Sequence, residues 1–222
     1  MAEIRITGLK FQYPGERAFE MSISDLQIAS GECAAIVGPS GSGKTTLLSL
    51  VAGIQVPHAG DIVVGNDHIN QLGETARRKF RLKQVGQVFQ AFELLEYLSV
   101  FENVLLGSII DSSVVEDARS RATQLLSAVG LSHKARSKPA RLSHGERQRV
   151  AVCRAMLNHP GLILADEPTG NLDQVNKQNV VDLLIQQAKA EKSTLLMVTH
   201  DQSLLDAFDR VINFEELTGA GT

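Results

Sequence analysis

The sequence predicts an α/β fold built on a parallel sheet, and three observations carry this prediction. Short, wholly apolar runs typical of buried strands occur at 33–37 and 162–165. A helical pattern at 174–190 separates such runs, and strand–helix–strand order with apolar strands is typical of a parallel sheet covered on both faces. The pattern between 99 and 158 is helical, so a block of helices is expected to be inserted into the sheet core.

The remaining elements follow in chain order. Segments 3–10 and 21–28 alternate polar and apolar residues, as edge or antiparallel strands do. The run 33–37 leads straight into a glycine-rich turn, and 45–53 then has the pattern of a helix ended by glycine. Further strands are expected at 61–65, 85–89, 194–199 and 211–214, and further helices at 114–129 and 146–158.

Length and composition are those of an ordinary globular chain. The 222 residues are 43% hydrophobic and 21% charged, which fits one large domain or a core with a subdomain. We expect a single unit over 1–222, with about 1–90 and 159–222 forming the core and about 91–158 forming the helical subdomain. The net charge of −3 gives no electrostatic case for nucleic acid, so no nucleic-acid partner is expected.

Cysteine usage and hydropathy point to the cytoplasm. Cys33 and Cys153 lie in apolar surroundings and are expected to be buried thiols rather than a disulfide. No apolar run approaches the roughly 20 residues that span a bilayer. The N-terminus lacks a basic start followed by an apolar core, so no signal peptide is expected.

A phosphate-binding loop is the strongest local signal. Residues 38–46 read GPSGSGKTT and match the pattern G-x-x-x-x-G-K-[ST]. Glycines let several backbone N–H groups converge on phosphate oxygens, and the helix that follows points its positive end at the same anion. Lys44 is expected to reach the β- and γ-phosphates, and the Thr45 hydroxyl to bind Mg²⁺. The predicted ATP-binding residues are Gly38, Pro39, Ser40, Gly41, Ser42, Gly43, Lys44, Thr45 and Thr46.

A pair of adjacent acids ends the apolar run at 162–165. The sequence there reads LILADE, and an acid ending such a strand holds Mg²⁺ in phosphate-loop ATPases. Asp166 fits that role, and Glu167 is placed to polarise the attacking water. The alternative is a solvent-exposed strand end, which Lys44 and Thr45 in the same chain make less favourable.

Two longer motifs indicate a family. They are RLSHGERQRVAVCRAML from Arg141 and DEPTGNLD from Asp166. Together with the phosphate loop, the Gln of VFQ and the His of VTHD, they resemble in order the ATP-binding subunit of an ABC transporter. The resemblance covers essentially the whole chain. PTGNLD and the segment VFQAFELLEYLSVFENV are most similar to the macrolide-exporter and lipoprotein-releasing branch.

This resemblance implies a fold, a reaction and partners. The fold is a P-loop NTPase core with an N-terminal antiparallel β subdomain and an inserted helical subdomain. The reaction is ATP hydrolysis with Mg²⁺, coupled to closing and opening of a head-to-tail homodimer. The partner is an integral-membrane permease, which would hold the chain on the cytoplasmic face of the inner or plasma membrane. The work done is export, efflux or transmission of force across the membrane.

The resemblance also implies roles for single residues. Gln90 matches the glutamine that touches Mg²⁺ and the attacking water, and His200 matches the histidine that contacts the γ-phosphate. Lys44, Gln90, Glu167 and His200 are thus the expected catalytic residues, and Thr45, Gln90 and Asp166 the expected metal ligands. Asp173 matches the aspartate that communicates between subunits. Tyr13 matches the aromatic that stacks on adenine, with Phe11 or Phe19 as alternatives.

The segment LSHGE at 142–146 resembles the family signature LSGGQ. Ser143 and Gly145 match the positions that contact the γ-phosphate held by the other subunit. Ser143 is also expected to cap a helix, with Glu146 completing a capping box. His144 and Glu146 depart from the pattern. Either His144 makes dimer closure sensitive to mildly acidic pH, or it is a solvent-side substitution of little effect.

Two other functions stay open at this point. One is an ABC-type ATPase acting on ribosomes or DNA, although relatives of that kind carry two cassettes or a long coiled coil. The other is a non-hydrolysing regulatory module, which the presence of Glu167 and His200 disfavours. A basic cluster either faces lipid headgroups or a permease, or forms a solvated helix face. The cluster consists of Arg77, Arg78, Lys79, Arg81 and Lys83.

Overall fold

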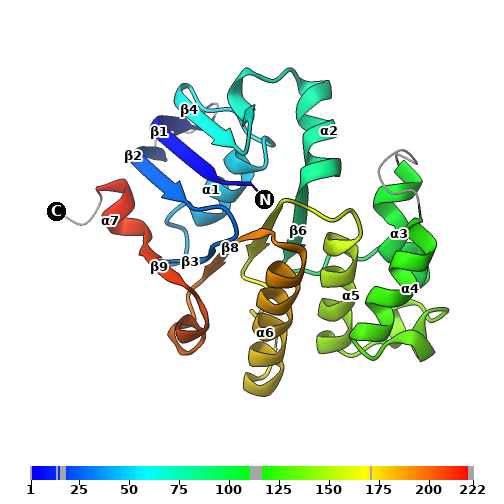
Figure 1. Cartoon of the computed structure of the whole chain (residues 1–222). Coiled ribbons are helices and arrows are strands. Elements are labelled where there is room, and N and C mark those ends of the chain that lie inside the picture. Colours follow the sequence, from blue (N-terminus) through cyan, green and yellow to red (C-terminus); the bar gives the residue numbers. More distant parts are fainter. Residues whose placement is uncertain (1, 14, 16–18, 111–116, 171, 220–222) are drawn as a thin grey trace.

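The computed structural model describes residues 2–13, 15, 19–110, 117–170 and 172–219 (Figure 1). These residues form a four-stranded antiparallel sheet in the order β2-β1-β4-β5 and a five-stranded parallel sheet in the order β6-β7-β8-β3-β9. The predicted α/β fold with an N-terminal antiparallel part is therefore confirmed. The antiparallel strands are β1 (Ile4–Gln12), β2 (Glu20–Ile28), β4 (Ala59–Val64) and β5 (Asp67–His68).

The antiparallel sheet contains one irregularity, at Gly8. Strand β1 pairs with β2 from Ile4 to Gln12, whereas its register with β4 shifts between Thr7 and Lys10. Gly8 has a φ of +57°, and a Cβ on Gly60 of β4 would lie 2.5 Å from the Gly8 carbonyl carbon. Only glycines permit this close approach of two backbones. The shift lets apolar side chains on both halves of β1 face the core.

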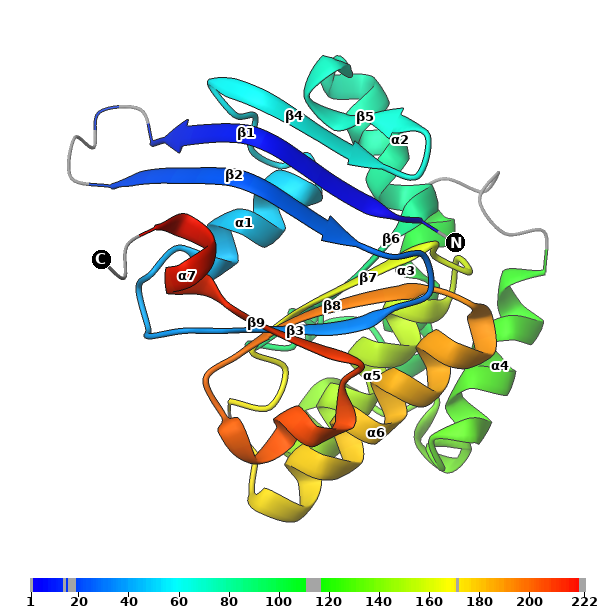
Figure 2. The same ribbon diagram turned by 60° about the vertical axis from the view of Figure 1, so that its left-hand side comes forward.

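The parallel sheet lies between two layers (Figure 2). One layer is the antiparallel sheet with helix α1 (Lys44–Val51), and the other is made of helices. Alternate residues of β7 contact different layers: Leu162 and Leu164 join the core beneath the antiparallel sheet, while Ile163 and Ala165 join the helical core. The strands are β3 (Cys33–Val37), β6 (Val85–Phe89), β7 (Leu162–Asp166), β8 (Thr194–Thr199) and β9 (Arg210–Asn213).

The helices between β6 and β7 pack side by side as a block at one end of the molecule (Figure 1). They are α3 (Val100–Ile110), α4 (Ala118–Ala128) and α5 (His144–Met156), and α6 (Gln174–Glu191) follows β7. The first residues of the helix expected at 114–129 lie outside the described residues. The boundaries of the helical subdomain at about 91 and 158 stay a prediction. Short 3₁₀ helices lie at Ile69–Gln71, Ser132–Lys134, Pro139–Arg141 and Gln202–Ala207.

Three elements add to or differ from expectation. Helix α2 (Glu74–Gln84) carries the basic cluster, for which a helix face was one of the two alternatives but no helix bounds were predicted. The strand expected at 211–214 ends at Asn213, whose side chain accepts a hydrogen bond from the Glu215 N–H and caps α7 (Phe214–Thr218). Helix α5 begins at His144 rather than 146, because Ser143 caps it.

The two cysteines are free and buried, as predicted. Burial raises the pKa of both thiols, that of Cys153 to about 12. Among the described residues, no helix has the length and apolar character needed to cross a bilayer.

Candidate active site

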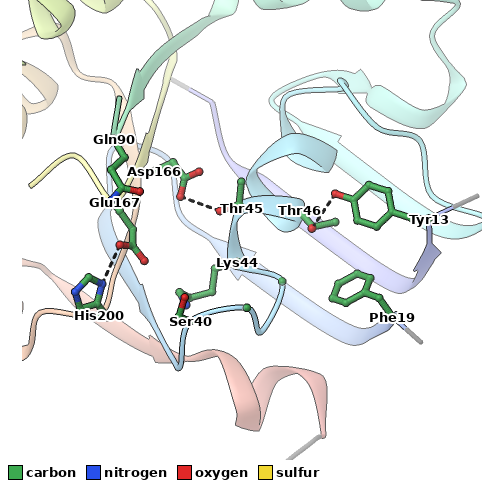
Figure 3. Close-up of a pocket in the computed structure, with 12 residues that line it drawn as sticks. Tyr13, Phe19, Ser40, Lys44, Thr45, Thr46, Gln90, Asp166, Glu167 and His200 are labelled. Carbon is green, nitrogen blue, oxygen red and sulfur yellow. Dashed lines mark hydrogen bonds and ion pairs between the residues drawn. The ribbon is translucent and has the colours of Figure 1, made fainter. Parts of the chain in front are cut away.

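A cavity of about 740 Å³ opens where the parallel strands end (Figure 3). The strands β3, β6, β7 and β8 each deliver polar residues to it from the segment after their carboxyl end, which is where ligands bind in parallel α/β sheets. Two aromatic side chains close its other end. The lining residues are Tyr13, Phe19, Ser40, Gly41, Gly43, Lys44, Thr45, Thr46, Gln90, Asp166, Glu167 and His200.

The Lys44 side chain folds back against the phosphate loop that precedes it. Its Nζ donates hydrogen bonds to the carbonyl oxygens of Gly38, at 2.9 Å, and Pro39, at 2.6 Å, and the residue is 4% exposed. Gly38, Pro39 and Ser42 do not line the cavity; they surround this amine instead. The loop therefore keeps a buried cation directly below the space that an anion would fill.

Gly43 must be glycine on two counts. Its φ is +108°, and a Cβ there would lie 2.7 Å from Cζ of Phe19. As the residue before Lys44 it occupies the N-cap of α1, and it offers no side chain to the first-turn N–H groups. Those N–H groups and the helix dipole point toward the cavity, which suits an anionic ligand.

Thr45 and Asp166 meet across the cavity. The Thr45 hydroxyl donates to Asp166 Oδ1 at 3.1 Å, and burial raises the pKa of the Asp166 carboxyl. Gln90 lies on the same wall (Figure 3). Hydroxyl, amide and carboxylate oxygens are ligands that Mg²⁺ accepts, and Mg²⁺ characteristically takes few protein ligands beside a phosphate. A partly buried carboxylate held by a hydroxyl therefore fits the ion.

Glu167 reaches the cavity through an unusual backbone conformation. Its φ is +43°, and its N–H donates to the Val198 carbonyl of β8 at 3.0 Å. Glu167 Oε2 lies 2.9 Å from His200 Nδ1. Left-handed non-glycine residues are costly and gather at functional sites, so this geometry marks Glu167 as a residue held in place for its position.

The aromatic end of the cavity contains two rings rather than one. The Tyr13 hydroxyl lies 3.0 Å from Thr46 Oγ1, and the Tyr13 and Phe19 ring centroids are 5.8 Å apart. Phe11 is 3% exposed and packs edge-on against Tyr13, so it is a core residue. The stacking of Tyr13 on adenine stays a prediction, and Phe19 stays its alternative.

Three predicted residues lie away from the cavity. Ser143, Gly145 and Asp173 are not among its lining residues. Ser143 caps α5 in the predicted capping box, and Asp173 caps α6 by accepting from the N–H and side chain of Asn176.

Asn176 joins these outlying residues, and sequence reasoning missed it. Besides pairing with Asp173, it packs against the signature glycine: a Cβ on Gly145 would lie 2.9 Å from Asn176 Oδ1. It belongs to no motif and only its position in the first turn of α6 could have drawn attention to it. The starts of α5 and α6 are thus in direct contact.

The two departures from the family signature have different surroundings. Glu146 accepts from the Ser143 N–H at 2.9 Å and pairs with Lys134 at 2.9 Å, and these contacts lower its pKa. His144 is exposed, and its ring centroid is 5.7 Å from that of Phe92. Glu146 therefore stabilises its own chain, while His144 contacts the segment after Gln90.

Residues 21–170 match the family model described as ABC transporter. The chain belongs to this family. It is 42% identical to the lipoprotein-releasing system ATP-binding protein LolD of Pseudomonas fluorescens, over 96% of this chain and 93% of that protein. It is 43% identical to the LolD of Xanthomonas campestris, over 86% and 80%.

Solved structures agree with this membership. The dimeric post-hydrolysis state of the ATP-binding cassette MJ0796 bound to ADP and Pi has a TM-score of 0.83 at 33% identity, covering 95% of this chain and 93% of that one. CbiO1 of Clostridium perfringens, part of the transporter complex cbiONQ, has a TM-score of 0.83 at 28% identity, covering 95% and 83%. This chain is an ABC ATP-binding subunit that binds ATP with Mg²⁺ and hydrolyses it.

Proposed function

We propose that this ABC ATPase powers a separate integral-membrane permease of the lipoprotein-releasing type from the cytoplasmic face of the inner membrane. Relatives that it matches over most of their length include lipoprotein-releasing system ATP-binding proteins. The mode of action is inferred from one observation: the predicted ATP-binding residues lie in two separate places. The cavity gathers Lys44, Glu167 and His200, whereas Ser143 and Gly145 lie outside it.

This separation supports a site shared by two copies. An ATP in the cavity would present its γ-phosphate to a second chain, and the N-terminus of α5 with Ser143 offers N–H groups and a hydroxyl to an anion. Two chains arranged head to tail would each complete the other's cavity. MJ0796 forms dimers in two of its structures, which supports the same arrangement here. ATP would hold the dimer closed, and hydrolysis would let it open.

Within one chain, catalysis is mainly positioning and charge stabilisation. Lys44 and the loop N–H groups would hold the β- and γ-phosphates, and Glu167 would orient and polarise the attacking water. His200 would contact the γ-phosphate while its pairing with Glu167 holds that carboxylate in place. Mg²⁺, held by Thr45, Asp166 and Gln90, would neutralise phosphate charge.

A second cavity offers a place for the permease. It measures about 410 Å³ and is lined by residues of α2, β6, α3 and α5, together with Glu93, which follows Gln90 by three residues. Its floor is largely apolar, and Ile110 at its edge is 62% exposed. A short amphipathic segment of a membrane protein would bury that apolar surface.

The basic cluster on α2 is in part structural. Arg77 donates to the Leu72 carbonyl at 2.7 Å, and Arg81 donates to the Gly53 carbonyl at 2.7 Å. Arg78 pairs with Glu74, yet Arg78 and Arg81 also line the second cavity. These contacts favour a role for the basic cluster in packing and in lining the second cavity over a role in binding lipid headgroups.

Purification of the chain from its host membranes, followed by identification of the membrane protein that comes with it, tests this proposal. The complex should hydrolyse ATP faster than the isolated chain and release lipoproteins from proteoliposomes. Ile110→Asp should abolish both effects, whereas Ile54→Asp, at a position that is 47% exposed and does not line the second cavity, should preserve them. Recovery of ribosomes in place of a membrane protein, or no turnover with the permease present, would contradict the proposal.

A further inference from the structure

Residues 91–99, which we call the linking segment, connect Gln90 at the end of β6 to helix α3. The segment begins with an irregular backbone: Phe92 and Glu93 are consecutive non-glycine residues with φ of +62° and +50°. Such conformations persist only where the surroundings hold them. The side chains that hold this turn therefore determine where the chain goes after Gln90.

Arg154 of α5 holds that turn. Its Nη2 donates to the Phe92 carbonyl at 2.8 Å, and its Nη1 donates to the Glu93 carbonyl. Both acceptors belong to the two left-handed residues. The planar guanidinium presents two donors in a fixed fork, which suits two adjacent carbonyls better than the single ammonium of lysine does.

The rest of the linking segment is bonded to the same block of helices. Asn103 of α3 is fully buried and bonds to the Leu95 N–H at 2.8 Å and to the Ser99 carbonyl at 3.0 Å. Lys138 donates to the Tyr97 carbonyl at 2.7 Å. In the described part of the chain, the side chains that hydrogen-bond to this segment come from residues 102–154.

Helix α5 connects the signature residue Ser143 to Arg154. Helix α5 begins just after Ser143, the signature residue, and Arg154 lies eleven residues further along it, about 16 Å away at the rise of an α-helix. His144 at its first turn also packs on Phe92. A rigid displacement of α5 would thus displace residues 92 and 93, and with them Gln90 at the cavity.

We propose that Arg154 is a positioning residue for ATP hydrolysis, which transmits movement of the signature helix α5 through the carbonyls of Phe92 and Glu93 to Gln90. It touches neither nucleotide nor water itself. The proposal rests on the two-copy site proposed above, because the second copy's nucleotide is what would move α5. It also requires that the linking segment move together with the helices that hold it, and not with the parallel sheet.

The test compares Arg154→Met with Arg149→Met in the purified full chain. Arg149 lies on the same helix, and within the described residues its side chain makes no hydrogen bond to the linking segment. Hydrogen exchange without nucleotide should show peptide 91–99 losing protection in Arg154→Met alone. The kcat should fall about 10- to 100-fold, as expected for a misplaced catalytic group, while the KM for ATP changes by less than about twofold.

Two further measurements separate this inference from the proposed function. In a Glu167→Gln background, Arg154→Met should still form the ATP-bound dimer. If the Glu167→Gln chain itself stays monomeric, the proposed two-copy site is wrong. The hydrogen-exchange result then still decides whether Arg154 holds the linking segment. Arg154→Lys, which keeps the charge and stem, should fold and give an intermediate kcat. Unchanged exchange and kcat in Arg154→Met, or equal changes in Arg149→Met, would overturn the proposal.

Discussion

His200 Nδ1 lies 2.9 Å from Glu167 Oε2, although the two residues follow different strands of the parallel sheet. The Glu167 side chain is 19% exposed and the His200 side chain 58%. The carboxylate is thus partly enclosed while the imidazole remains open to a ligand. This pairing connects the group that we expect to polarise water with the group that we expect to contact the γ-phosphate.

Glu167→Gln should therefore remove hydrolysis and leave ATP binding intact. Loss of a general base lowers kcat by about 10²- to 10⁴-fold, whereas the amide still fits the cavity. Phosphate release and nucleotide titration measure the two effects separately. Glu74→Gln, at an exposed i,i+4 pair on α2, is the matched control and should leave both unchanged. Equal kcat in Glu167→Gln and wild type would rule out this role.

Asp166 should make the nucleotide-free chain less stable at neutral pH. Its pKa is raised in the folded state because burial disfavours the charged form. A carboxyl with a raised folded pKa contributes stability when protonated, and that contribution is lost as pH rises through the unfolded and then the folded pKa.

Asp166→Asn should consequently raise the Tm of the nucleotide-free chain at pH 7.5, and the gain should shrink as the buffer is made more acidic. The amide can still accept from Thr45. Thermal denaturation across pH measures the effect, and Asp182→Asn on α6 serves as control. A gain that does not depend on pH would contradict the assignment of the cost to ionised Asp166.

Gly145→Ala should weaken dimer formation without weakening ATP binding by one chain. A methyl group there would lie 2.9 Å from Asn176 Oδ1 and displace the start of α6, where Asp173 lies. Light scattering in a Glu167→Gln background measures association. Gly73→Ala is the control, because no atom lies within 4 Å of a Cβ at Gly73. Loss of association in both variants would assign the effect to stability instead.

Gly43→Ala should lose ATP binding and destabilise the fold, whereas Gly41→Ala should be tolerated better. The added methyl group at Gly43 meets the Phe19 ring at 2.7 Å, an overpacking that costs about 1–3 kcal/mol. At Gly41, φ is +78° but the space is open, so backbone strain of about 1–2 kcal/mol is the only cost. Denaturant unfolding measures the free energy of unfolding of both variants, and nucleotide titration measures their affinity for ATP. Equal losses in Gly43→Ala and Gly41→Ala would show that the contact with the Phe19 ring is unimportant.

Much of the fold follows from local sequence patterns. The strands at Cys33–Val37 and Val85–Phe89 have the predicted bounds. Cys33–Val37 is a continuous apolar run that ends at Gly38, whereas Val85–Phe89 alternates between buried and partly buried residues. Motifs predict the phosphate loop, Asp166, Glu167, Gln90 and His200. These four residues and most of the loop line one cavity, while Gly38, Pro39 and Ser42 lie behind it around the Lys44 amine. Parallel strands bring their carboxyl ends to one edge, so segments distant in sequence meet there.

Other features depend on tertiary contacts that no local pattern encodes. Helix α2 is held in part by Arg81 bonding to the Gly53 carbonyl, a contact across 28 positions. Phe214 is buried in the core and starts α7, which ended the last strand one residue before its predicted end. Asn176 and Arg154 act through neighbours in space, on Gly145 and on the Phe92 carbonyl.

The central claim is that two copies of this chain share each ATP, with the cavity of one completed by Ser143 and Gly145 of the other. Light scattering on Glu167→Gln with Mg-ATP tests it most directly, because this variant should bind ATP without hydrolysing it. We predict a particle with twice the mass of one chain, which returns to a single chain when ATP is replaced by ADP. A Glu167→Gln chain that binds Mg-ATP and stays monomeric would contradict the claim.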